Sequence, residues 1–345
     1  MPILPQAMLY YSRADGDTLF GGLFWTEKCT ACNDMNKRRF FKSILGAVIV
    51  VLLALQGCGT SFQETPGQAY HHLVVLGDPH LPGQHLAEKE RVIEKINTWE
   101  DVELVVAVGD ICAEYGTEAE YAAARAFFAK LHKPLLPIAG NHDYIHETPT
   151  GSGGGYKLGS QASQQAKLNL FRKTFGLSTL FSSKQVGGYL LLFLSTDHES
   201  FVTGMSEAQL DWLRTQLARH RSTPTIIFFH GPLNGTQHKF RRYVNRPNAI
   251  AQPAETIHDL ITANPQIFLW VSGHTHTPPS EESYASPINL YAGQVTNIHN
   301  TDMKRETIWT NSLFLYPDKV VVRTFNHREG AWQPDLERTI PLPRL

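Results

Sequence analysis

The side chains in this chain that could do chemistry together are carboxylates, imidazoles and one amide, and each follows closely on a short apolar run. Seven of them are donors suited to metal ions: Asp78, His80, Asp110, Asn141, His230, His274 and His276. One divalent ion takes about four to six ligands, so seven donors with one shared carboxylate suit two adjacent ions. Two ions about 3.5–4 Å apart can stabilise both the attacking and the leaving oxygen of an in-line displacement. The pattern therefore predicts a dinuclear metal site.

The chemical types of these donors limit which metals they would bind. No cysteine belongs to the set, which disfavours a closed structural zinc site. A mixture of carboxylate and imidazole fits Mn²⁺, Fe and Zn²⁺ about equally. The sequence thus predicts two divalent ions and leaves their identity open among these three metals.

Strands are expected to position the donors. The apolar runs that precede them cover residues 73–76, 104–108, 135–138, 226–229 and 267–271. Short, continuous apolar runs are typical of strands buried on both faces. Ligands bind outside the carboxyl ends of strands in open α/β sheets, so donors at five strand ends indicate one shared site.

Helical patterns alternate with these strands and predict an α/β fold that begins as a right-handed βαβαβ unit. Capping-box matches at Thr117–Glu120 and Ser206–Gln209 each mark the start of a helix. Helices are expected at about 86–99, 117–131 and 161–173, after Ser206, and after Pro253. Beyond His276 the chain is expected to be all strand, at 288–291, 307–315 and 319–325.

The ordered motifs D-x-H, G-D, G-N-H-D, H and G-H-x-H, each after an apolar run, resemble the calcineurin-like metallophosphoesterase family over about residues 73–291. This resemblance implies an α/β (α+β sandwich) fold of two packed mixed sheets flanked by helices. It implies that Asp78, His80 and His276 hold one metal, that Asn141, His230 and His274 hold the other, and that Asp110 bridges them. A hydroxide between the ions would then attack phosphorus.

The resemblance also assigns roles to the two residues that follow Asn141. His142 would face the substrate, where it stabilises the transition state or protonates the leaving oxygen. Asp143 would hold the imidazole of His142 in the correct tautomer and orientation. A carboxylate at position 143 could instead cap a turn.

The substrate class is a phosphoric ester, and a phosphodiester is favoured slightly over a phosphomonoester. Family protein phosphatases carry an arginine shortly after the G-D motif, where this chain has none. Purple acid phosphatases carry a tyrosine ligand where this chain has Ala113. Arg241 and Arg242, in the loop after His230, are candidates to bind the phosphate. A metal-binding scaffold without turnover stays open as an alternative.

The N-terminal residues are expected to direct export. A positive stretch at 37–42 precedes the apolar run 44–55, which has the length of a signal-peptide core. Leu55-Gln56-Gly57-Cys58 then resembles the lipobox of bacterial lipoproteins, in which the cysteine is lipidated. The expected domains are a dispensable or untranslated leader (1–34), a signal peptide (35–57), a tether (58–70) and a metallophosphoesterase domain (71–345). An uncleaved anchor ending in a chance cysteine is the alternative.

Location and partners follow from these features. Gly59 stands where an Asp would indicate retention in the inner membrane, so we expect an outer-membrane lipoprotein facing the periplasm. Export by the general or the twin-arginine route stays open. A formal net charge of −1 predicts no nucleic-acid groove. The expected partners are a small phosphoester and, through the lipid alone, a membrane, with no obligate protein partner.

Overall fold

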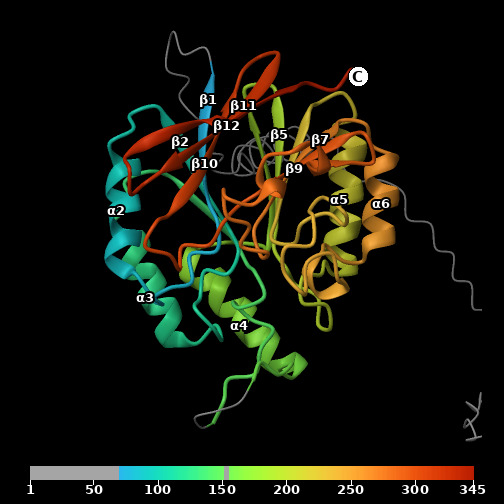
Figure 1. Ribbon diagram of the computed structural model, residues 1–345. Coiled ribbons are helices and arrows are strands. Elements are labelled where there is room, and N and C mark those ends of the chain that lie inside the picture. The colour runs from blue at the N-terminus through green and yellow to red at the C-terminus, as the bar shows by residue number, and fades with distance from the viewer. Residues whose placement is uncertain (1–69, 151–154) are drawn as a thin grey trace, which may run out of the picture. The chain divides into compact units, whose positions relative to one another are not determined.

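The computed structural model describes residues 70–150 and 155–345. In this part of the chain two mixed sheets of six strands pack against each other (Figure 1). The first sheet has the order β12 (Ala331–Pro341), β11 (Lys319–Asn326), β10 (Trp309–Leu315), β1 (His71–Leu76), β2 (Val102–Val108) and β3 (Leu135–Ile138). The second has the order β4 (Phe181–Val186), β5 (Tyr189–Leu194), β6 (Thr225–Phe229), β7 (Ile267–Ser272), β9 (Val295–His299) and β8 (Leu290–Tyr291).

Parallel strands form the centre of each sheet, and antiparallel strands complete it. β1, β2 and β3 are parallel to one another, as are β5, β6, β7 and β9. Alternate residues of β1 face opposite sides: Leu73 and Val75 pack into the core between the sheets, while Val74 and Leu76 face the helices. Burial on both faces explains why these strands have continuous apolar sequences.

Helices cover the outer face of each sheet (Figure 1). The helices α2 (Leu86–Asn97), α3 (Glu118–Phe128) and α4 (Gln161–Phe175) share an apolar core with β1 and β2. The helices α5 (Glu207–Arg219) and α6 (Ala254–Thr262) pack on β5, β6 and β7. The predicted α/β sandwich of two mixed sheets flanked by helices is confirmed.

The two predicted capping boxes differ in outcome. Thr117 and Glu120 form the complete reciprocal box at the start of α3. Ser206 accepts a hydrogen bond from the backbone amide of Gln209, but the Gln209 side chain donates to the Ser195 carbonyl and to Asp197. The second box is therefore only half formed, because the Asp197 carboxylate accepts the Ser206 backbone amide that the Gln209 side-chain oxygen would otherwise accept.

The region after His276 contradicts the prediction that it is all strand. It contains the 3₁₀ turns η2 (Glu282–Tyr284) and η3 (Pro287–Asn289), and only Leu290–Tyr291 of the first predicted strand forms. A further 3₁₀ turn, η1 (Pro247–Ala249), precedes α6. β4, β9 and β12 were not predicted, because β4 and β12 are half-exposed edge strands and β9 carries polar residues.

The predicted export signals lie outside the described residues, and so does Cys58. Within the described ranges, no helix combines the length and the apolar character that a membrane span requires. Cys112 is a free cysteine that is buried in the core beside α3.

Candidate metal centre

The loops that follow β1, β2, β3, β6 and β7 converge at one edge of the two sheets and carry all seven predicted donors. Five of these donors have a left-handed backbone: Asp78 (φ 35°), His80 (47°), Asp110 (51°), His274 (64°) and His276 (49°). A non-glycine residue in that region is strained by about 1–3 kcal/mol, and such residues cluster at functional sites. The fold thus accepts backbone strain to direct these side chains at one point.

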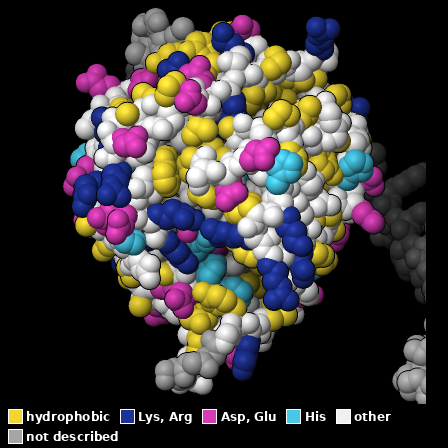
Figure 2. Space-filling model, in the orientation of Figure 1, with side chains coloured by type: hydrophobic (Ala, Val, Ile, Leu, Met, Phe, Trp, Pro, Cys, Tyr) yellow, Lys and Arg dark blue, Asp and Glu magenta, His cyan; other side chains and the backbone are white. Residues whose placement is uncertain are grey.

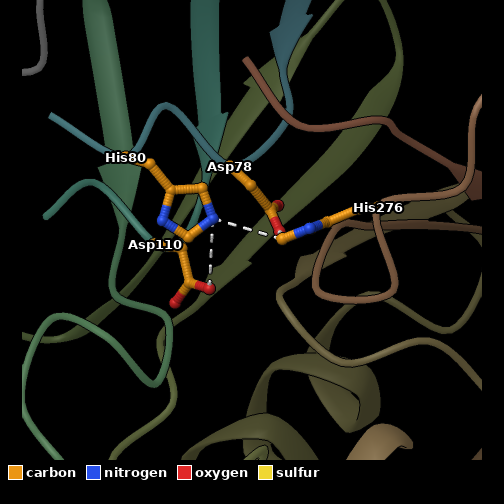
Figure 3. A group of neighbouring side chains, drawn as sticks. All are labelled: Asp78, His80, Asp110 and His276. Atoms are coloured by element: carbon orange, nitrogen blue, oxygen red, sulfur yellow. Dashed lines mark hydrogen bonds and ion pairs between the residues drawn. The ribbon is translucent and has the colours of Figure 1, made fainter. Parts of the chain in front are cut away.

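The first group of donors comprises Asp78, His80, Asp110 and His276 (Figure 3). Nε2 of His276 lies 2.8 Å from Oδ2 of Asp78 and 3.2 Å from Nε2 of His80. The same nitrogen of His80 lies 3.9 Å from Oδ2 of Asp110. Each residue offers one ligand atom within 4.8 Å of the others, so one cation could contact all four.

The second group comprises Asp110, Asn141, His230 and His274. Nε2 of His230 lies 3.3 Å from Oδ1 of Asp110, 3.1 Å from Oδ1 of Asn141 and 3.2 Å from Nδ1 of His274. Asp110 belongs to both groups, with one carboxylate oxygen nearest to each. This is the geometry that a carboxylate shared between two ions requires.

The donor chemistry fits two cations. Nε2 of His80 faces Nε2 of His276, and Nε2 of His230 faces Nδ1 of His274, each pair 3.2 Å apart. Two imidazole lone pairs at that distance repel each other unless a proton or a metal ion lies between them. His80, Asp110 and His230 are buried, so water does not relieve that repulsion.

Shifts of the imidazole pKa values show where positive charge is favoured. Burial lowers the pKa of His276, but the adjacent Asp78 and Asp302 carboxylates together outweigh burial and raise this pKa to about 10. Burial is likewise outweighed by Asp110 at His230, whose pKa is about 9. Burial and the neighbouring charge of His230 lower the pKa of His274 to about 3. A protonated imidazole therefore balances the charge of Asp78 and another balances that of Asp110. Two bound cations would balance the same two carboxylates.

The glycines of the motifs allow the chain to approach the carboxylates closely. A Cβ on Gly273 would lie 2.0 Å from Oδ1 of Asp78, and a Cβ on Gly140 would lie 2.4 Å from Oδ1 of Asp110. Neighbouring backbone amides use this proximity: His274 donates to Asp78 at 2.8 Å, and His142 donates to Asp110 at 2.9 Å. Gly140 and Gly273 are thus required sterically.

Comparison with known families places these motifs in context. The sequence model of a family described as calcineurin-like phosphoesterase matches residues 71–278, which is more than half of the chain. The chain belongs to the calcineurin-like phosphoesterase family. As a member, it is a metal-dependent phosphoric ester hydrolase, and the predicted resemblance is confirmed. Among curated proteins, none matches this chain significantly.

Solved structures with the same fold support this assignment of the architecture. A dimetal phosphatase from Danio rerio superposes with a TM-score of 0.54 at 14% identity, covering 80% of this chain and 100% of its own. A purple acid phosphatase from yellow lupin (Lupinus luteus) seeds superposes with a TM-score of 0.55 at 17% identity, covering 80% of this chain and 55% of its own. At these identities the likeness shows the fold alone.

Most of the phosphoesterase's imidazole donors are held by a hydrogen bond at the second ring nitrogen, which fixes the ring orientation. Nδ1 of His230 lies 2.8 Å from the carbonyl of Val108, and Nε2 of His274 lies 2.9 Å from the carbonyl of Asn248. Nδ1 of His276 lies 3.2 Å from the carboxylate of Asp302. In the described part of the chain, Nδ1 of His80 is buried without a partner.

Asp302 is a site residue that the sequence analysis missed. It accepts from Nε of Arg305 at 2.7 Å with Oδ1 and contacts His276 with Oδ2. The amide of the next residue, Met303, donates to the carbonyl of Asp78 at 3.1 Å. Asp302 follows β9 closely, as the predicted donors follow their strands, but β9 lacks a continuous apolar run to reveal it.

His142 lies at the mouth of the centre. Its Nε2 is 3.9 Å from Oδ2 of Asp110, and its ring meets that of His80 edge to face at 5.0 Å. Nδ1 lies 3.1 Å from the carbonyl of Glu114, which selects the tautomer with a proton on Nδ1. Burial lowers the pKa of His142, while the charge of Asp110 opposes the change. In its neutral form, the ring thus presents the lone pair of Nε2 to the centre.

The prediction that Asp143 orients the ring of His142 is wrong. The carboxylate of Asp143 accepts instead from the backbone amides of Gly140 (2.7 Å), Cys112 (2.8 Å) and Ile111 (3.2 Å). Asp143 therefore joins the loop after β2 to the loop after β3. The Glu114 carbonyl, rather than Asp143, orients the ring of His142. Successive residues in this turn point in different directions, which adjacency in sequence does not reveal.

Cationic side chains border the exposed histidines on one face (Figure 2). Arg241 and Arg242 lie in the loop after β6, and Nη1 of Arg241 donates to the hydroxyl of Tyr243 at 3.1 Å. Burial lowers the pKa values of His80 and His142, and the charge of Lys304, which follows Met303, adds to this effect. Lys304 is thus a further candidate to contact a bound phosphate.

Proposed function

We propose that this calcineurin-like phosphoesterase hydrolyses phosphodiesters with two ions of Mn, Fe or Zn held by the seven donors. The position of Asp110 carries the proposal, because its two carboxylate oxygens face the two groups of donors separately. When bound, two such ions would supply an activated water and neutralise charge on the phosphoryl oxygens. His142 would contact the substrate through Nε2, since the Glu114 carbonyl holds Nδ1.

The surroundings of Asp110 support a diester over a monoester. The loop after Asp110 continues as Ile111-Cys112-Ala113-Glu114-Tyr115, so it supplies no cation to bind a phosphate dianion. Arg305 is engaged with the Asp302 carboxylate. A diester carries one negative charge and needs less compensation than a dianionic monoester.

The test compares two substrates that release the same product. Protein loaded with Mn²⁺ is given bis(4-nitrophenyl) phosphate or 4-nitrophenyl phosphate, and nitrophenol is followed. We expect the diester to react faster, and Asp110→Asn to lower its rate by at least about a hundredfold. Asp211→Asn, which changes an exposed carboxylate on α5, is the matched control.

Each other outcome supports a different function. A faster reaction of the monoester would make the protein a phosphomonoesterase on small molecules or nucleotides. Binding of two Mn²⁺ ions without hydrolysis of either substrate would leave a non-catalytic metal-binding scaffold.

We further propose that the enzyme is exported and anchored by lipid on Cys58, in the outer membrane facing the periplasm. The motif Leu55-Gln56-Gly57-Cys58 supports this location, as does Gly59 after it. Cells fed a radiolabelled fatty acid should label the protein, and Cys58→Ala should abolish the label. A wild-type chain that takes up no label would overturn the proposal.

A further inference from the structure

An exposed tyrosine stands beside the metal centre. The ring of Tyr156 lies 5.0 Å from that of His142, almost perpendicular to it at 87°. It also packs against His146 at 4.5 Å and Tyr115 at 5.6 Å. Despite these contacts, 52% of Tyr156 is exposed. A single exposed aromatic residue is ordinary on a protein surface, but this one borders the residue that faces the substrate.

The segment that follows Tyr156 is hydrogen bonded to the chain before the loop. The amide of Glu147 donates to the carbonyl of Lys157 at 2.8 Å, and the amide of Gly159 donates to the carbonyl of Ile145, also at 2.8 Å. Both bonds lie on the C-terminal side of Tyr156, one and three residues after it, and join that segment to residues 145–147. The ring therefore stands directly before a paired segment of backbone.

His146 connects this aromatic cluster to the donors. Its Nε2 lies 3.3 Å from the amide nitrogen of Asn141, whose Oδ1 faces His230. Lys167 from α4 donates to the carbonyl of His146. His146 thus contacts both the Tyr156 ring and Asn141, a member of the second group of donors, and so links the ring to the metal centre. Figure 2 shows hydrophobic side chains beside the exposed histidines on this face.

We propose that Tyr156, flanked by Tyr115, stacks against the planar aromatic ring of one ester group of the substrate, and that this ring is a nucleobase. This inference rests on the proposed function, because only a phosphoester bound at the two groups of donors would bring its ester group to Tyr156. Aromatic side chains stack on any base, so the surface would select nucleoside phosphoesters without selecting one base. A sugar between phosphate and base would pass the edge of His142.

The test measures binding rather than turnover. Calorimetry with the Mn²⁺-loaded protein compares adenosine 5′-monophosphate, ribose 5-phosphate and phenyl phosphate. We expect the nucleotide to bind about tenfold more tightly than ribose 5-phosphate. Tyr156→Ala should remove that difference, while Tyr156→Phe should keep it. Tyr316→Ala changes a tyrosine at the β10–β11 turn, next to the start of β1, and serves as the control.

The outcomes separate the two proposals. If the nucleotide binds no more tightly than ribose 5-phosphate, or if Tyr156→Ala weakens both equally, stacking by Tyr156 is excluded. If phenyl phosphate matches the nucleotide, the ring read by Tyr156 is an aryl group attached directly to phosphate, and a nucleobase is excluded. Tight nucleotide binding without hydrolysis of any diester would overturn the proposed function and leave the stacking surface intact.

Discussion

The carboxylate of Asp302 contacts Nδ1 of His276 at 3.2 Å, on the side of the ring opposite the metal-facing nitrogen. Nε2 of the same ring lies 2.8 Å from Asp78, within the first group of donors. Arg305 holds the other oxygen of Asp302 at 2.7 Å, so the carboxylate cannot turn away from the imidazole. A carboxylate at this position orients a histidine ligand and raises its basicity.

Replacing Asp302 should therefore weaken metal binding without touching a metal ligand. We expect Asp302→Asn to lower the affinity for Mn²⁺ at the first group by about 10–100-fold. The second group, which lacks contact with Asp302, should keep its affinity. Calorimetric titration would then show one weakened site and one unchanged site. Asp211→Asn is the control, and equal weakening of both sites would indicate a general structural effect instead.

The donors could be predicted from sequence because their strands are buried on both faces. Runs such as Leu104–Val108 leave the apolar pattern abruptly at Gly109, so the polar residue that follows marks a strand end. Asp302 follows β9, whose buried Asn297 and His299 are hydrogen bonded inside the core and interrupt that pattern. Polar residues satisfied by distant partners are indistinguishable from loop residues in the sequence alone.

The error at Asp143 has a different origin. The motif indicated that His142 and its neighbour lie at the site, and both do. Which group each side chain contacts depends on the loop after β2, whose backbone amides at Ile111 and Cys112 are brought to Asp143 by the parallel pairing of β2 and β3. That contact is set by tertiary structure, so local sequence could not reveal it.

Asp143 should accordingly matter for stability and assembly of the site. Asp143→Asn exchanges one accepting oxygen for an amide group that faces backbone donors. We expect the free energy of unfolding to fall by about 1–3 kcal/mol, because buried amides lose their acceptor. Urea unfolding of the metal-free protein would measure this change. An unchanged stability together with an altered pH profile of the rate would restore the role first predicted for Asp143.

His142 should matter for the rate and not for stability. Its ring is partly exposed and its side chain lies outside both groups of donors. We expect His142→Asn to lower kcat for the diester by about 10²–10⁴-fold, the usual contribution of a positioned proton donor or acceptor. The stoichiometry of bound Mn²⁺ should stay at two. A loss of bound metal would instead make His142 part of the metal centre.

Lys304 should contribute more to substrate binding than Arg241 and Arg242 do. It lies on the segment that the Met303 amide ties to Asp78, and its charge reaches His80 and His142. We expect Lys304→Met to raise KM for the diester by about tenfold, because one charged contact to phosphate is lost. Replacing both arginines with methionine should change KM less. Lys173→Met, on the exposed side of α4, is the control, and a larger effect of the arginine pair would reverse this order.

The affinity for metal should rise with pH because metal ions must displace protons from two imidazoles. The Asp78 and Asp302 carboxylates together outweigh burial and raise the pKa of His276 to about 10, and Asp110 with Asp78 raises that of His230 to about 9. Below pH 9 both rings are therefore protonated in the metal-free protein, and each must release a proton before it can bind a cation. Between pH 6 and pH 8, the affinity for each Mn²⁺ ion should increase by about tenfold per pH unit.

Calorimetry in two buffers of different ionisation enthalpy would count the protons directly. One proton released per ion is expected, and the count should fall towards zero as the pH passes about 10. His142→Asn should leave the number of released protons unchanged, because the His142 side chain lies outside both groups of donors. An affinity independent of pH would mean that His230 and His276 are neutral before metal binds, and that the carboxylates are balanced in another way.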